Sequence, residues 1–277
     1  MRTQALLLVV GVTAFLAGCS SGSATADPGT PAFLWNAAAQ TYHNGDLAKA
    51  NYNLSELQQS DNVFAPRARI WQVVLAAGMA RGYSELADAY EAGAKFNRDN
   101  SLPFHKQVTD LRAQANHAAM DFTQAVHSFA AQDPSADVQL SFELPPGSAV
   151  EPPSLRKVFA GIILPDAEAQ ALETAMVERG VIRVLCLANG VGEDSAQVLV
   201  KYKANEVKTS RATFLYAAAK TLFEASDIFA SNRLDQPQRR KVMCDEALVA
   251  LSSVPETKDS VLLVTRIQNV LRKIPGA

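Results

Sequence analysis

The sequence predicts a mostly α-helical protein, an α-solenoid of helical hairpins over residues 33–134 followed by a second, mainly helical domain over 156–277. Apolar residues recur at the spacing of a helical stripe along most of these two spans. Features of the first hairpin also return 34–38 residues later, a period typical of stacked helical repeats. Alternating patterns that indicate strands are short and few, so any β element is expected to be small.

The first residues have the pattern of an export signal. Arg2 supplies a positive charge, and an apolar stretch runs from Ala5 to Leu16. This stretch is too short for a permanent membrane helix, which needs roughly 20 residues. It ends in Leu16-Ala17-Gly18-Cys19, which resembles the lipobox of bacterial lipoproteins. The alternative is an ordinary signal peptide in which Cys19 lies near the cleavage point by chance.

The resemblance to lipoproteins implies that residues 1–18 are a removed signal peptide and that the Cys19 thiol carries lipid. By the same resemblance, Ser20 after the cysteine favours the periplasmic face of the outer membrane if the organism has two membranes. Residues 19–32 are small, polar and proline-containing, and we expect a flexible tether. No later segment reaches about 18 apolar residues. Lipid on Cys19 is therefore expected to be the only membrane contact.

Four helices are expected after the first hairpin, in two further pairs. The first hairpin turns at Gly45-Asp46. Pro66 suits the first turn of the next helix, which Gly82 is expected to end. The remaining helices are predicted at about 84–96, 104–118 and 121–132.

The repeating positions resemble tetratricopeptide repeats. The first unit offers Trp35, Ala38, Ala39, Tyr42, Gly45-Asp46, Ala50 and Leu57, and the second offers Trp71, Leu75, Gly82, Ala87 and Ala94. The third unit departs from the pattern, with Met120 where glycine is expected. The alternative is an irregular array of helical hairpins outside that family.

The resemblance implies a concave groove, lined by the first helix of each hairpin, that binds a partner protein. The matching positions are Asn36, Gln40, His43, Arg69, Gln72, Met79, Asp110, Gln114 and His117. Polar amides, an arginine and a flexible methionine suit contact with an extended peptide backbone. The alternative is that these are ordinary solvent-facing positions.

A proline-rich linker or edge strand at 135–155 is the expected domain boundary, because Val138 to Leu144 alternate apolar and polar residues. Beyond it, helices are expected at 168–179, ended by Gly180, and at about 209–229, 237–253 and 257–273. The stretches 181–187 and 197–203 are rich in β-branched residues, which leaves a small hairpin or helix open, with helix favoured.

No catalytic constellation stands out. Ser195 lacks the following glycine of a nucleophile elbow, and the four histidines have no metal-ligand spacing. Cys186 and Cys244 form either a disulfide or two separate buried thiols. The net charge of −2 gives no basic excess for binding nucleic acid.

We expect a lipid-anchored interaction scaffold for an envelope protein, with no cofactor, no metal and no enzymatic activity. The alternative is an envelope enzyme acting on cell wall or lipid, with its site in the C-terminal domain.

Overall fold

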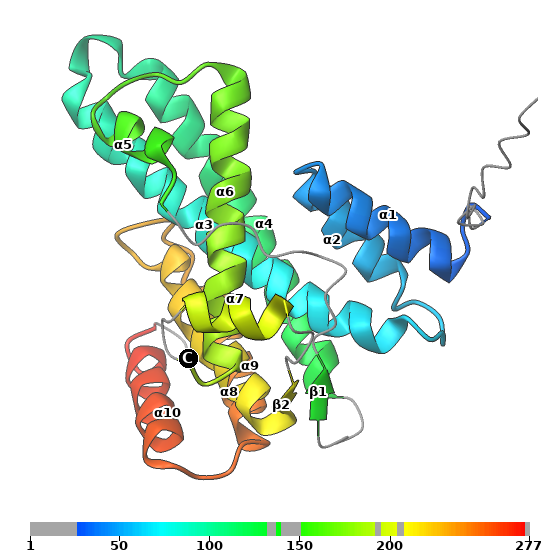
Figure 1. The fold of residues 1–277 in the computed structure, drawn as a ribbon. Helices are drawn as coiled ribbons and strands as arrows, with labels where there is room; N and C mark the ends of the chain where they lie inside the picture. Colours follow the sequence, from blue (N-terminus) through cyan, green and yellow to red (C-terminus); the bar gives the residue numbers. More distant parts are fainter. Residues whose placement is uncertain (1–26, 132–136, 140–150, 192–194, 204–207, 275–277) are drawn as a thin grey trace, which may run out of the picture.

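The computed structural model is mostly α-helical, as predicted, and is arranged as packed helical hairpins with a small two-stranded sheet (Figure 1). The structure describes residues 27–131, 137–139, 151–191, 195–203 and 208–274. The lipobox, Cys19 and most of the predicted tether lie outside these residues, as does most of the predicted linker. Within the described ranges, no helix is long and apolar enough to cross a membrane.

The elements follow one another in a simple order along the chain. They are α1 (Pro31–His43), α2 (Leu47–Glu56), α3 (Ala65–Phe96), the 3₁₀ turn η1 (Arg98–Asn100), α4 (Leu102–Ala130), β1 (Asp137–Gln139), α5 (Pro153–Phe159), α6 (Asp166–Ala188), α7 (Ser195–Lys203), β2 (Lys208–Ser210), α8 (Arg211–Ala225), the 3₁₀ turn η2 (Ser226–Phe229), α9 (Pro237–Ser252) and α10 (Lys258–Leu271).

The first predicted hairpin is present as α1 and α2. The Thr30 side chain accepts a hydrogen bond from a free backbone N–H of the first turn of α1, and Asp46 caps α2 by accepting from the backbone of Lys49. Between the helices, Gly45 has φ +77°, a conformation that suits glycine. The indole of Trp35 is buried and stacks on Phe64 at a centroid distance of 5.7 Å, which attaches the hairpin to the start of α3.

The two further predicted hairpins are wrong, because each pair of short helices is one long helix. α3 runs without interruption through Gly82, and α4 runs through Met120. Gly82 does not end α3 because it is a contact point: a methyl group on it would lie 2.7 Å from backbone atoms of Val177 in α6. No glycine or proline stands near Met120 to stop α4. α3 and α4 instead form one long antiparallel hairpin.

The predicted end of a helix at Gly180 is also wrong. α6 continues to Ala188 and crosses α3 where a methyl group on Gly180 would lie 2.5 Å from the carbonyl oxygen of Gly78. Residues 181–187 are therefore helical, and residues 197–203 belong to α7. Helix, the favoured alternative for both stretches, is confirmed.

The sheet joins the two halves of the chain. Part of the predicted strand, Asp137–Gln139, pairs antiparallel with Lys208–Ser210, and Val138 faces Thr209. The Thr209 hydroxyl also donates to the carbonyl oxygen of Ala188 at 2.6 Å, which holds β2 against the end of α6. The expected 209–229 helix is α8 continued by η2, and the last two predicted helices are α9 and α10.

The hydrophobic core does not divide at the predicted linker. Buried side chains form one cluster that extends from Trp35 in α1 to Ile267 in α10. α6 and α8 both pack on α3, and α8 and α9 pack on α4. The N-terminal hairpin pair and the C-terminal helices therefore share a core, with α3 and α4 at its centre.

Candidate functional sites

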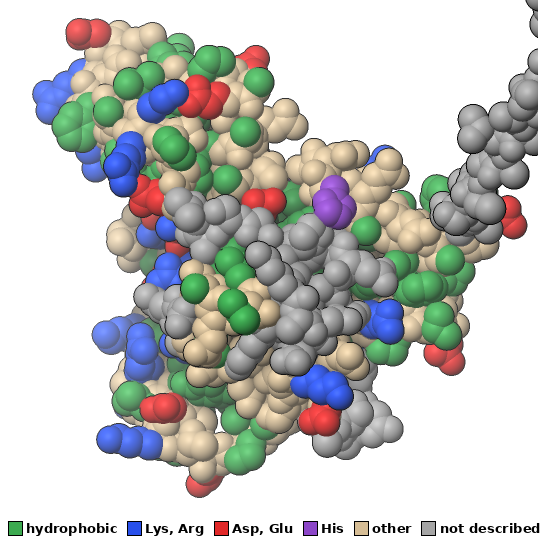
Figure 2. Space-filling view, viewed as in Figure 1, with side chains coloured by type: hydrophobic (Ala, Val, Ile, Leu, Met, Phe, Trp, Pro, Cys, Tyr) green, Lys and Arg blue, Asp and Glu red, His purple; other side chains and the backbone are tan. Residues whose placement is uncertain are grey.

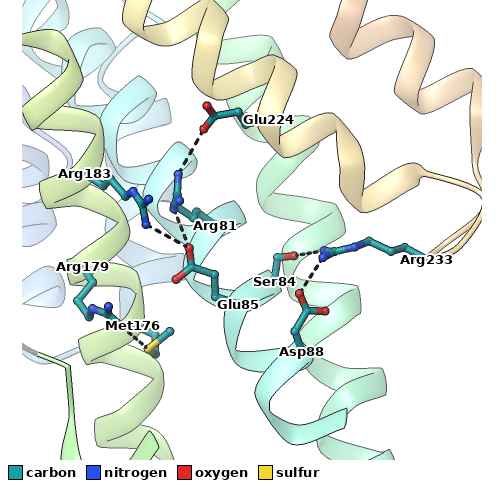
Figure 3. Close-up of polar contacts among 9 residues, drawn as sticks. All are labelled: Arg81, Ser84, Glu85, Asp88, Met176, Arg179, Arg183, Glu224 and Arg233. Atoms are coloured by element: carbon teal, nitrogen blue, oxygen red, sulfur yellow. Dashed lines mark hydrogen bonds and ion pairs between the residues drawn. The ribbon is translucent and has the colours of Figure 1, made fainter. Parts of the chain in front are cut away.

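Two adjoining pockets lie along α3, one against α6 and one against α8. The first has a volume of about 140 Å³ and the second about 200 Å³, and Arg81 and Glu85 line both. Figure 3 shows that arginines and carboxylates from the three helices point toward one another here.

The ion pairs in these pockets connect helices. Arg81 Nε donates to Glu85 Oε1 at 2.8 Å, and its Nη1 lies 3.5 Å from Glu224 Oε2 in α8. Arg183 Nη1 of α6 lies 3.9 Å from the same Glu85 oxygen (Figure 3). Arg81 is only 22% exposed, so its pairs are better shielded from water than typical surface pairs. Through Arg81 and Glu85, the network links α3 to both α6 and α8.

A second group of contacts attaches the segment after η2 to α3. Arg233 donates from Nη1 to Ser84 Oγ at 2.9 Å and from Nη2 to Asp88 Oδ2 at 2.8 Å (Figure 3). Cations and carboxylates are therefore matched across this wall of the larger pocket. These charged groups serve to connect helices, and we assign the crevice a structural role.

The predicted groove residues fall into two exposed groups and one interior group. Asn36, Gln40 and His43 are exposed on one stripe of α1. On α4, Asp110 and His117 are exposed and Gln114 is half-buried. The positions on α3 are Arg69, Gln72 and Met79.

The three α3 positions are less accessible than a groove requires. Arg69 is half-buried, and Gln72 accepts a hydrogen bond from Gln58 Nε2 at 2.6 Å. Met79 is only 6% exposed and belongs to the hydrophobic core. The prediction that Met79 lines a groove is wrong, because α3 is one continuous helix that neighbouring helices cover on several sides.

Acidic and tyrosine side chains gather between the α1–α2 turn and the helices α3, α4 and α6. Burial raises the pKa of Glu173 in α6, and the negative charge of Asp110 in α4 raises it further. Burial, followed by the charges of Glu173 and Asp46, raises the pKa of Tyr83 to about 12. Asp110 therefore lies within electrostatic range of Glu173, and both Glu173 and Asp46 lie within electrostatic range of Tyr83. We call Asp46, Tyr83, Asp110 and Glu173 the acidic group.

The surface is hollowed in this region. Figure 2 shows a depression between the lobe formed by the α1–α2 hairpin and the lobe that contains the upper part of α6. The hairpin meets α6 at Gly45, where a methyl group would lie 2.8 Å from Thr174 Oγ1. It meets α4 through Asn51, whose Nδ2 donates to Asp121 Oδ2 at 3.0 Å. We call this depression the hollow.

Sequence reasoning found part of this region. His43, Asp110, Gln114 and His117 were predicted to line one groove. His43 is on α1, and the other three share helical spacing on α4 with Asp121, which bonds to Asn51 of the hairpin. Glu173 and Tyr83 were not singled out, because each belongs to a helix whose pattern shows only an amphipathic face. The signal that identifies them is spatial, since α6 lies far from α1 and α4 in the sequence.

The two described cysteines are separate buried thiols rather than a disulfide. Cys244 Sγ lies 3.7 Å from Ser226 Oγ, and burial raises the pKa of its thiol. A raised pKa disfavours the reactive thiolate. Cys186 lies in α6 and Cys244 in α9, and the structure has both as free thiols, so the disulfide alternative is not the one that it adopts. Among the described residues, no group of three or more histidine, cysteine, aspartate or glutamate side chains is placed to bind a metal ion.

Comparison with protein-family models, with curated proteins and with solved structures gave no match to this chain.

Proposed function

We propose that this protein is a lipid-anchored scaffold of the bacterial cell envelope that binds a partner protein in the hollow. The lipobox sequence supports the anchor at Cys19 and, with Ser20, the periplasmic face of the outer membrane where two membranes exist. The groove residues of α1 and α4 support the hollow as the binding surface.

One observation carries the proposal for the hollow. Asp46, Asp110 and Glu173 come from three separate elements, and none of them forms an ion pair within the described ranges. Burial of Glu173 carries a desolvation cost, and Asp110 and Glu173 repel each other. A cationic partner segment offsets the repulsion between Asp110 and Glu173, so we infer that the partner presents lysine or arginine here.

Photo-crosslinking tests the binding surface. A photoreactive amino acid at His43 or Gln114 in the intact protein is expected to capture a protein from the envelope. The same amino acid at Val249, an exposed position on α9, is the control. Capture from Val249 alone would contradict the proposal for the hollow.

Charge variants test the chemistry of the partner. Asp110→Asn combined with Glu173→Gln is expected to reduce capture about ten-fold, since a close charge pair at an interface contributes roughly 1.5 kcal/mol or more. Glu256→Gln, which neutralises an exposed carboxylate in the turn before α10, is expected to leave capture unchanged. Equal capture by all variants would contradict a cationic partner.

Lipid attachment is tested separately from binding. Cells supplied with labelled palmitate are expected to incorporate label into the protein, and Cys19→Ala is expected to abolish incorporation. Persistent labelling of Cys19→Ala would contradict the anchor. Conversion of cell-wall or ester substrates by the purified chain would instead support the alternative of an envelope enzyme.

A further inference from the structure

Five large apolar side chains are exposed at one end of the molecule. They belong to three segments that the fold brings together: the end of α3, the start of α4, and the end of α5 with the loop that follows it. They are Phe96 at 76% exposed, Leu102 at 78%, Phe159 at 45%, Ile162 at 51% and Ile163 at 42%. We call this set the apolar end. Exposed apolar side chains that gather at one end of a molecule mark an interaction surface more often than scattered ones do.

The backbone contacts at this end hold the segments in place. Asn97 follows α3 directly, and its Nδ2 donates to the carbonyl oxygen of Gly161 at 2.9 Å. A methyl group on Gly161 would lie 3.2 Å from the backbone of Asn97, so the two turns are in close contact. Phe96 and Ile162 are the neighbours of these two residues in the sequence. The apolar side chains are therefore presented by a fixed arrangement of turns.

Cations surround the apolar end. Exposed lysines and arginines occur on all three segments, namely Lys95, Arg98, Lys106, Arg156 and Lys157. Figure 2 shows basic and hydrophobic side chains together on the lobe that carries this end.

Carboxylates at this end pair with some of the cations and leave others unpaired. Glu151 pairs with Arg156 at 3.3 Å, and Glu168 pairs with Lys157 at 2.7 Å. Asp99 and Asp166 are also exposed. Lys95, Arg98 and Lys106 form no ion pair within the part of the chain that the structure describes. The five cations outnumber these four carboxylates by one, in a chain whose net charge is −2.

We propose that the apolar end inserts into the surface of an anionic lipid bilayer. Phenylalanine, leucine and isoleucine enter the boundary between headgroups and acyl chains, while lysine and arginine stay at the lipid phosphates. Charge complementarity favours anionic lipid over a neutral surface. The end is formed by turns and helix ends at the tip of the α3–α4 hairpin (Figure 1). A fluid bilayer adapts to such a protruding shape, whereas a folded partner would need a matching cavity.

This contact is independent of lipid on Cys19 and would be a second contact with the membrane. The apolar end and the start of α1 lie at opposite sides of the molecule (Figure 1). A second lipid contact at the far side would orient the body and leave the hollow in a fixed position relative to the membrane surface.

A depth-sensitive fluorescence experiment tests the insertion in the full chain. Leu102→Cys is labelled with an environment-sensitive nitrobenzoxadiazole dye and mixed with vesicles of phosphatidylglycerol and phosphatidylethanolamine that contain nitroxide-labelled lipid. Cys19 is replaced by serine in the parent chain and in both variants, so that the dye cannot label the N-terminal segment. Cys186 and Cys244 are about 1% exposed or less, so they stay unlabelled in the folded protein. The parent chain, treated in the same way, supplies the background. Val249→Cys on α9 is the matched control, with an exposed aliphatic side chain away from this end.

We expect nitroxide lipids to quench the dye strongly at position 102 and weakly at position 249. Equal quenching at both positions would overturn the proposal. Quenching at 102 that requires an added membrane-protein extract would also overturn it, in favour of a protein partner. These outcomes do not depend on how the N-terminus is attached, because the dye reports which side chain meets lipid.

Charge variants give a second readout in the same vesicles. Lys95→Gln, Arg98→Gln and Lys106→Gln are each expected to weaken association of the apolar end about five-fold, as for a cation near an anionic surface. All three side chains are exposed, so the fold is expected to survive these changes. High salt is expected to act in the same direction. Unchanged quenching at position 102 in the triple variant would contradict the contribution of charge.

Discussion

The α1–α2 hairpin and the crossing of α3 with α6 are attached to the molecule by different kinds of contact. The hairpin is held by side chains, including buried Trp35 and the Asn51–Asp121 hydrogen bond, and by the approach of Gly45 to Thr174. At the crossing, the backbones themselves meet at Gly78, Gly82 and Gly180.

This difference has a consequence for the hollow, which lies between the two regions. Side chains adjust by changing rotamers, whereas two touching backbones leave no room for adjustment. The α6 wall of the hollow is therefore expected to be rigid, and the side-chain contacts of the hairpin wall are expected to adjust more readily. The four substitutions below probe this contrast in order of expected effect.

Gly180→Val should have the largest effect. Its Cβ would lie 2.5 Å from the carbonyl oxygen of Gly78, and the remaining methyl groups would separate α3 from α6. We expect a loss of more than about 3 kcal/mol in the free energy of unfolding, which is at or beyond the largest destabilisation usual for an overpacked core. Urea denaturation measures it.

Gly190→Ala is the control for this substitution. Gly190 has φ +65° but nothing within 4 Å of an added methyl group, so only backbone strain of about 1–2 kcal/mol is expected. If Gly180→Val destabilises the protein no more than Gly190→Ala does, the backbone contact is not as close as described.

Gly45→Ala should have the next largest effect and should act on the hairpin. It adds strain at φ +77° and places a methyl group 2.8 Å from Thr174 Oγ1, with an expected loss of about 2 kcal/mol. Thr174→Ala in the same chain should recover the steric part. Hydrogen exchange should show faster opening in α1 and α2 with α3 unchanged, and faster exchange in α3 would count against a separately attached hairpin.

The contrast between the two regions also explains how far the sequence predicted the fold. Gly45 was correctly predicted to mark a turn, because Asp46 follows it as a helix cap. Gly82 and Gly180 were wrongly predicted to end helices, because their role depends on backbones that lie opposite them in space. A glycine that ends a helix and a glycine that lets a helix touch another backbone look the same in the local sequence.

The candidate sites were predictable to the same degree. Asp110 and His117 were found from repeat spacing, although the spacing itself came from hairpins that the structure replaces with long helices. Glu173 was not found, because it reaches the hollow from a helix distant in the sequence. Phe96 and Leu102 received no role because apolar residues at helix ends have the same pattern whether they are buried or exposed.

Arg81→Leu should have a smaller effect, although it lies beside the rigid crossing. It removes the link between Glu85 and Glu224 but leaves Arg183 near Glu85. We expect a loss of about 1 kcal/mol, because the pairs are only partly shielded from water. Arg156→Leu, whose side chain is 83% exposed, should change stability by less than half of that. Equal losses in urea denaturation would show that the network of Figure 3 adds nothing to an exposed pair.

Glu173→Gln should have the smallest effect and the opposite sign. Burial raises the pKa of Glu173 above its ordinary value of 4.5, with a further contribution from Asp110. The native state therefore binds this proton more tightly than the unfolded state, so stability falls as the pH rises above 4.5 and Glu173 ionises.

Glutamine has no charge to desolvate, so Glu173→Gln should raise stability at pH 7 by less than about 1 kcal/mol. Subtracting the pH dependence of the parent from that of the variant removes the contribution of Asp121, whose pKa burial also raises. The difference should shrink as the pH falls and become constant below about 4.5, where Glu173 is protonated in both the native and the unfolded state. Glu256→Gln should show no such trend. A variant less stable than the parent at pH 7 would mean that Glu173 has a cationic partner within the chain, and the hollow would then have no unpaired carboxylate there to offer a binding protein.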